Sequence, residues 1–185
     1  MTNTDLKSKT YGADEALVLK KTRLKDTHNI VTLFSKSFGK MKLTSFGSRS
    51  LKSRKLSHLE TGNVITFSWV EQGEYKTLSE TELQYGHSGI KEDEEKLNTM
   101  FMILYILNRL LPENEPENQV YSHTLKFFRA LQKAPQSMQE IEVFLKGILL
   151  DLGFVDDSEV AKSTFNPMDF IEGLIGQKIR IGEWA

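Results

Sequence analysis

The chain has no cysteine among its 185 residues. Disulfide bonds, thiolate zinc sites and cysteine nucleophiles are therefore excluded. The first fifteen residues are polar, and no uncharged run approaches the roughly 18 residues that a membrane-spanning helix needs. We therefore expect a cytoplasmic protein. A hydrophobic content of 39% is enough to build a core, so folded domains are expected.

Motifs of catalytic chemistry are also missing. The sequence has no Gly-rich phosphate loop of the P-loop or dinucleotide type, no Gly-x-Ser-x-Gly elbow and no His-Glu-x-x-His. His58, His87 and His123 are too scattered to predict a metal site. We therefore expect no catalytic residues, no metal and no cofactor, and a protein that is not an enzyme.

Positive charge is concentrated in one part of the chain. Between Leu17 and His58 there are eleven Lys or Arg residues and a single acid, Asp26. From Leu59 onward there are eleven basic and twenty-one acidic residues. A polyanion would bind the first part and avoid the second, so the separation of charge points to nucleic acid.

The first half of the chain reads as a β-rich domain. After a polar tail over residues 1–14, β-branched and aromatic residues recur in short segments separated by turn signals such as Gly39 and Gly73. Five short strands indicate a small barrel of the OB type over residues 15–85. The predicted strands span 15–23, 30–34, 40–46, 64–70 and 75–83.

The second half has helical periodicity. Helical periodicity begins at Glu92, and an apolar stripe runs from Leu97 to Leu111, where Pro112 stops it. Further helices are expected over 117–133, over 137–152 with Gly153 closing the last turn, and over 168–175 after Asn166 and Pro167. The sequence thus predicts an α+β chain, in which the N-terminal five-stranded OB-type β-barrel is followed by an α-helical domain over residues 90–185.

Basic residues in the predicted barrel are the candidate nucleic-acid contacts. Lysines that alternate along the third strand predict one basic face. Phe46 shares that face, and its ring either stacks on a base, which contributes roughly 1 to 3 kcal/mol, or packs in the core. Trp69 is predicted to lie in the barrel core. The candidates at the first strand's end, on the third strand and in the following loop are Arg23, Lys25, Lys40, Lys42, Phe46, Arg49, Lys52, Arg54 and Lys55.

Several sequence blocks resemble those of one protein family. In the first half they are ALVLKK at 16–21, LFSKSFGK at 33–40, SFGSRSLKSRKL at 45–56 and KTLSETEL at 76–83. In the second half they are residues 98–111 followed by PEN, YSHTL at 121–125, and 144–154 with its LLDLGF. In order and spacing, these blocks are similar to those of the bacterial DNA repair protein RecO family.

The resemblance implies a non-enzymatic mediator of recombination. Such a protein binds single- and double-stranded DNA, anneals complementary strands and, with RecR, helps RecA to displace single-stranded DNA-binding protein. It also implies a location at the bacterial nucleoid.

The chain departs from the family at three places, of which one is Glu60-Thr61, where the family commonly has a Pro that ends the basic loop. Members often hold zinc through a cysteine cluster, which this chain lacks. Some members carry basic residues before the Phe of the LLDLGF-like block to hold the tail of single-stranded DNA-binding protein, whereas this chain has Glu142 and Val143. That contact is not carried over. A substitute partner-binding set on the helical domain is Lys126, Arg129, Lys133 and Lys146.

Two other functions fit the same charge pattern. A basic barrel also suits an adaptor that binds acidic protein segments. An OB protein that binds RNA is the other alternative, because charge and stacking do not distinguish the two sugars unless the 2′-hydroxyl is read.

Overall fold

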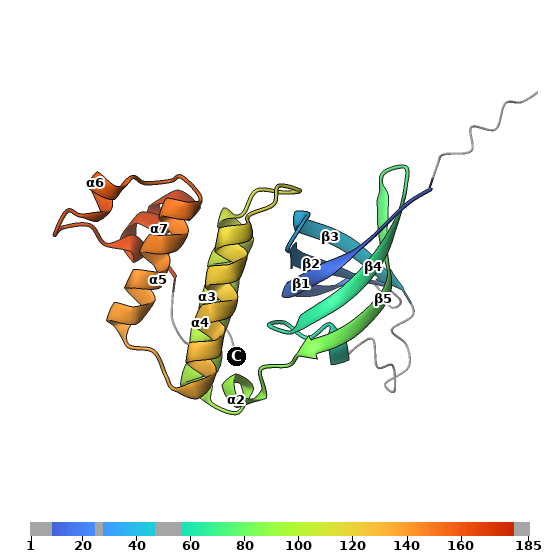
Figure 1. The fold of residues 1–185 in the computed structure, drawn as a ribbon, viewed down its shortest axis with the longest axis horizontal. Helices are drawn as coiled ribbons and strands as arrows, with labels where there is room; N and C mark the ends of the chain where they lie inside the picture. The colour runs from blue at the N-terminus through green and yellow to red at the C-terminus, as the bar shows by residue number, and fades with distance from the viewer. Residues whose placement is uncertain (1–8, 25–27, 47–56, 180–185) are drawn as a thin grey trace, which may run out of the picture. The chain divides into compact units, whose positions relative to one another are not determined.

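A computed structural model of the chain describes residues 9–24, 28–46 and 57–179. The chain divides into two compact units, Met1–Gly86 and His87–Ala185. The first unit holds strands β1 Lys9–Leu24, β2 His28–Ser35, β3 Gly39–Phe46, β4 Val64–Gln72 and β5 Tyr75–Tyr85 (Figure 1). The second holds helices α2 Ser88–Lys91, α3 Glu94–Leu110, α4 Asn118–Lys133, α5 Met138–Asp151, α6 Asp157–Val160 and α7 Pro167–Ile175.

The five strands close into a barrel in the order β1-β2-β3-β5-β4. β1 closes the ring because it pairs antiparallel with β2 along one edge and with β4 along the other. The pairing of β3 with β5 is parallel, at Thr44 and Thr77. The predicted fold class, an OB-type barrel followed by helices, is confirmed.

The barrel core follows from the alternation of side chains along each strand. Inward positions are aliphatic or aromatic, whereas the positions between them face outward. Trp69 is only 6% exposed, which confirms its predicted place in the core. The core cluster consists of Ala16, Val18, Val31, Leu33, Met41, Leu43, Leu59, Ile65, Phe67, Trp69 and Leu78.

Strand β1 begins at Lys9, so the prediction of a tail up to residue 14 is wrong. The first residues of β1 pair with β4 from Lys9 opposite Gln72 to Asp14 opposite Phe67. The residues at 9–14 show no alternation of hydrophobic side chains, so a strand was not predicted there. The pairing is held by backbone hydrogen bonds, which do not depend on hydrophobic side chains.

Asp14 connects β1 to the β2–β3 turn. Its carboxylate accepts hydrogen bonds from the Ser35 hydroxyl and, at 2.7 Å, from the Ser37 backbone N–H. The Phe38 N–H donates in turn to the Ser35 hydroxyl at 3.2 Å. Gly39 then takes a positive φ of 69°, which suits a residue without a side chain. This network fixes where β3 begins.

The helices of the second unit begin and end at the predicted signals. Ser137 and Glu140 form a capping box at the start of α5. At its end, Gly153 adopts a φ of 70°, and the N–H groups of Gly153 and Phe154 donate to the carbonyls of Leu150 and Leu149 in a Schellman motif. The short helix α6 was not predicted. In the described part of the chain, no helix is both long and apolar enough to cross a bilayer.

His87 is a buried histidine at the start of the second unit. It is the N-cap of α2 with a φ of 50°, and its Nδ1 lies 3.4 Å from Oε1 of Gln132 on α4. Its ring also packs edge-on against Phe128. Burial lowers the pKa of His87, and the nearby charges of Lys91 and Arg129 lower it further, although the hydrogen bond to Gln132 acts in the opposite direction.

We expect His87 to make the helical unit less stable in mild acid. Because the folded-state pKa lies below the unfolded-state value of 6.5, the unfolded chain binds more protons between the two values. Stability is therefore full above pH 6.5 and falls as the pH drops toward the folded-state pKa, by at most about 1.4 kcal/mol per pH unit. Urea unfolding followed by helical circular dichroism at about pH 7.5 and about pH 5.5 measures the loss.

The matched variant is His87→Asn, because asparagine tolerates the left-handed conformation and has no titrating group in this range. Its urea midpoint is expected to fall less between the two pH values than that of the wild type. An equal fall in both proteins would assign the pH dependence to other groups.

Candidate nucleic-acid interface

The outward side chains of β1, β2 and β3 form one continuous surface, which we call the basic face. Its members lie in three cross-strand rows set by the antiparallel register. The rows are Lys20, Thr32 and Lys42; Thr22, Ile30 and Thr44; and Leu24, His28 and Phe46.

The first row presents two positive charges to solvent. Lys20 and Lys42 are exposed on either side of Thr32, which is only 6% exposed. Directly paired residues of an antiparallel sheet have Cβ atoms about 5 Å apart, so two strands separate the lysines by about 10 Å. Two phosphates of one nucleic-acid strand fit this spacing.

The third row is apolar and aromatic. Phe46 is 49% exposed, and its ring packs edge-on against His28 with 4.6 Å between the ring centroids. Leu24, opposite His28, is 48% exposed. A ring that is about half exposed and packs edge-on against a neighbour is suited to stack on a base.

Lys20 reaches this surface through a β-bulge. The register of β1 with β2 shifts between Val18 and Lys20, so Val18 is opposite Leu33 and Lys20 is opposite Thr32. Without the bulge, strict alternation from Ala16 and Val18 would turn Lys20 inward. Lys20 is one of the eleven basic residues between Leu17 and His58, but alternation along the strand does not predict it as a contact.

The predicted contacts differ in where the structure places them. Lys42 and Phe46 lie on the basic face. Arg23 lies opposite Asn29, between the basic-face positions Thr22 and Leu24, and is exposed at the end of β1. Lys25, Arg49, Lys52, Arg54 and Lys55 lie outside the described residues.

The predicted exposure of Lys40 is wrong. This lysine is only 8% exposed, in contrast to Lys42 on the same strand. Lys40 is opposite Phe34, whose side chain is fully buried, so this end of β3 is covered. The alternation of a strand predicts which face a side chain occupies, but not whether that part of the face reaches solvent.

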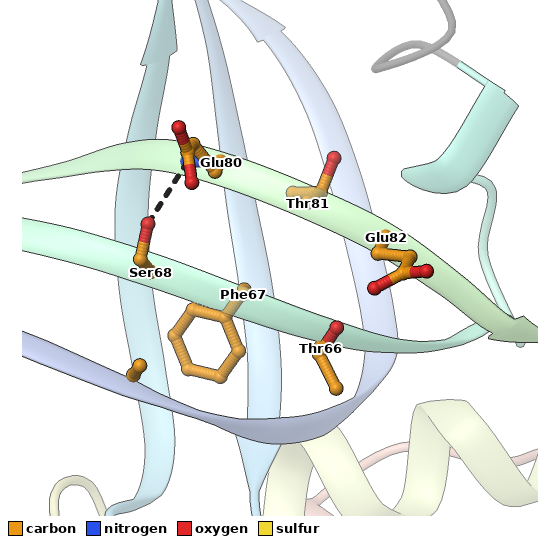
Figure 2. Close-up of a pocket in the computed structure, with 7 residues that line it drawn as sticks. Thr66, Phe67, Ser68, Glu80, Thr81 and Glu82 are labelled. Carbon is orange, nitrogen blue, oxygen red and sulfur yellow. Dashed lines mark hydrogen bonds between the residues drawn. The ribbon is translucent and has the colours of Figure 1, made fainter.

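The outer face of β4 and β5 is acidic. Thr66 and Ser68 on β4 lie opposite Glu82 and Glu80 on β5. Together with Ala13 they line an open depression of about 510 Å³ (Figure 2). The Glu80 N–H donates to the Ser68 hydroxyl at 3.2 Å. Two carboxylates at its rim make this depression unfavourable for a polyanion.

The predicted partner-binding residues lie on α4 and α5. Lys126, Arg129 and Lys133 are exposed on α4 at spacings of three and four residues, which place them on one side of the helix. Phe127 and Phe128 beside them are buried and belong to the core of the second unit. The Nζ atom of Lys146 lies 6.0 Å from the ring centroid of Phe165.

The histidines have structural partners. Nδ1 of His58 lies 3.0 Å from the carbonyl oxygen of Thr81, and Nδ1 of His123 lies 2.6 Å from a carboxylate oxygen of Asp151. Among the residues that the structure describes, no group of three or more His, Asp or Glu side chains is arranged to hold a metal ion.

Comparison with known proteins identifies the first unit. Residues 10–86 match the family model described as Recombination protein O N terminal. The DNA repair protein RecO of Thermoanaerobacter sp. (strain X514) is 32% identical over 124 residues, which are 65% of this chain and 50% of that protein. The protein of the same name from Dechloromonas aromatica (strain RCB) is 28% identical over 153 residues, 81% of this chain and 62% of that protein.

A third relative is similar over a comparable length. The DNA repair protein RecO of Chlorobium limicola (strain DSM 245 / NBRC 103803 / 6330) is 25% identical over 142 residues, 75% of this chain and 54% of that protein. The chain thus spans between a half and two thirds of the length of these relatives. The barrel described above matches the N-terminal domain model of Recombination protein O, and the chain is similar to DNA repair proteins RecO across both units.

Proposed function

We propose that this chain binds single-stranded DNA across the basic face and acts in recombinational DNA repair by annealing complementary strands. The observation that carries the proposal is the row of Lys20, Thr32 and Lys42 beside the exposed ring of Phe46, on the face of an OB barrel where such domains bind oligonucleotides. The relatives named for DNA repair support the same process.

The mechanism needs no catalytic group. Lysines that contact phosphates release condensed counterions, and a strand with part of its charge neutralised meets its complement more often. Contacts to the backbone leave the Watson–Crick edges of the bases free to pair. Ring stacking on Phe46 is reversible and holds a base for a short time only, so it does not block annealing.

The wider role is proposed from the family. It comprises binding to double-stranded DNA as well as single strands, cooperation with RecR, and assistance to RecA in loading on single-stranded DNA. The exposed residues Lys126, Arg129 and Lys133 on α4, with Lys146 on α5, are the proposed partner-binding positions on the helical unit.

The test is an annealing assay with two complementary oligonucleotides, one carrying a fluorophore and the other a quencher. The wild-type protein is expected to accelerate quenching at low salt and to lose this effect as salt rises. The slope of log affinity against log salt is expected to be about −0.7 for each phosphate contacted in a single strand.

Other results would assign the basic face to a different function. Absence of acceleration at low salt would overturn the annealing function. If the protein instead bound an acidic peptide with salt-sensitive affinity, the basic face would belong to a protein-binding adaptor. Faster annealing of RNA than of DNA would assign it to an RNA-binding role.

A further inference from the structure

Two strongly exposed tyrosines lie on the barrel outside the basic face. Tyr11 on β1 is 70% exposed and Tyr75 on β5 is 76% exposed. Both are near the β4–β5 turn, where Gly73 takes a φ of 64°. Neither tyrosine was predicted as a contact, because an isolated tyrosine in a polar segment forms no pattern.

The register places both tyrosines on the outer surface. Tyr11 is opposite Val70, which is opposite Thr77, and Lys9 is opposite Gln72, which is opposite Tyr75. The row of Gly12, Trp69 and Leu78 is adjacent to the row of Tyr11, and its members Trp69 and Leu78 belong to the core. Since alternate residues of a strand face opposite sides, the two rows face outward.

The tyrosine rows continue from the basic face. Thr77 pairs in parallel with Thr44, and Thr44 is the outward residue between Lys42 and Phe46 on β3. One row of backbone pairing therefore leads from the basic face across β5 and β4 to Tyr11. A strand bound on the basic face has a direct path to both rings.

The charges of neighbouring side chains favour these two rows as the path of a bound strand. The next rows along β4 and β5 contain Glu80 opposite Ser68 and Glu82 opposite Thr66, around the depression in Figure 2. Lys9 adds a positive charge to the row of Tyr75. Glu74, which precedes Tyr75 in the turn, is the acid closest in sequence to that tyrosine. Phosphates are favoured near Lys9 and Lys42 and repelled from Glu80 and Glu82.

We propose that Tyr11 and Tyr75 stack on the bases of a single strand that leaves the basic face across the Thr44 and Thr77 pairing. The proposal rests on the proposed function and extends it to a second base-binding area. The two tyrosines lie on strands two apart and in rows two residues apart, so their Cα atoms are separated by about 12 Å, with Val70 and Gln72 of β4 between them. Two separate rings suit two bases of one strand, whereas a protein partner usually buries a continuous apolar patch.

The test compares oligothymidine with an abasic strand of the same length, which has the same phosphates but no bases. Tyr11→Ala and Tyr75→Ala are each expected to weaken oligothymidine binding about fivefold or more, and to leave abasic binding and the salt slope unchanged. Tyr75→Phe keeps the ring and is expected to retain wild-type affinity. The matched control is Tyr85→Ala, because Tyr85 is 55% exposed at the other end of β5.

Each further outcome has a separate meaning. If the wild-type protein binds both strands and the alanine variants bind oligothymidine with the same affinity as the wild type, the stacking site is overturned. The proposed function then still stands. No binding by the wild type would overturn the proposed function itself. A change of oligomeric state in the alanine variants, seen by sedimentation without a change in DNA affinity, would assign the tyrosines to a contact between copies of the chain and overturn the stacking site.

Discussion

Reversing the charge of both lysines of the basic face is expected to weaken binding of single-stranded DNA by roughly 100-fold or more at 0.1 M salt. Each phosphate contact in a single strand changes affinity by about 0.7 log units per tenfold change in salt. One contact therefore raises the affinity at 0.1 M salt about fivefold relative to 1 M salt. Replacing the lysine with glutamate removes this gain and adds a repulsion of similar size. Lys20→Glu with Lys42→Glu removes two such contacts.

The measurement is a salt titration of oligothymidine affinity. The slope of log affinity against log salt is expected to become shallower by about 1.4 in the double variant, because two contacts are lost. The annealing rate is expected to fall in parallel.

A matched control keeps the same change in net charge but moves it to the helical unit. Lys126→Glu with Lys133→Glu alters two exposed lysines on α4 and is expected to leave the salt slope of DNA binding unchanged. Equal losses in the two double variants would show that overall charge, and not the basic face, controls affinity. Circular dichroism of both proteins confirms that each remains folded.

The second large effect is expected at Gly12, where Gly12→Ala destabilises the barrel by about 1 to 3 kcal/mol. A Cβ atom at this position would lie 2.5 Å from Cε2 and Cζ2 of Trp69. The indole ring has little room to move, because it lies in the core and packs edge-on against Phe38 with centroids 5.8 Å apart. The added methyl group therefore forces a shift of β1 or of the ring.

The matched control for Gly12→Ala is Gly147→Ala in α5, where nothing lies within 4 Å of the added atom. An alanine in a helix is favoured over glycine by roughly 0.5 to 1 kcal/mol, so this variant is expected to be slightly more stable. Urea unfolding followed by tryptophan fluorescence and by helical circular dichroism measures both variants. An unchanged fluorescence midpoint in Gly12→Ala would contradict the packing of Trp69 over Gly12.

Most of the secondary structure could be predicted from local patterns. The strand from Val64 alternates core residues such as Ile65, Phe67 and Trp69 with outward residues, and the structure confirms it. Gly153 and Ser137 marked the ends of α5, because capping depends on the residues at the cap and their immediate neighbours. Signals of this kind are complete within a few residues of sequence.

The candidate site was only partly predictable. Lys42 and Phe46 follow from the alternation of β3, but Lys20 depends on the bulge in β1. Tyr11 and Tyr75 are on the same surface only because β4 lies between their strands. A pairing register joins residues far apart in the chain, and no local pattern specifies it when the segments are polar.

By itself, the sequence determined the separation of charge, the strand and helix segments, and the blocks that resemble one family. Composition and short-range spacing carry this information, and they do not depend on how the segments pair. Only the tertiary structure decided that Lys40 is buried, that Lys20 joins Lys42 on one face, and that Gly12 lies against Trp69. Burial and neighbourhood are properties of the closed barrel, in which backbone pairing brings distant residues together and sets which of them water can reach.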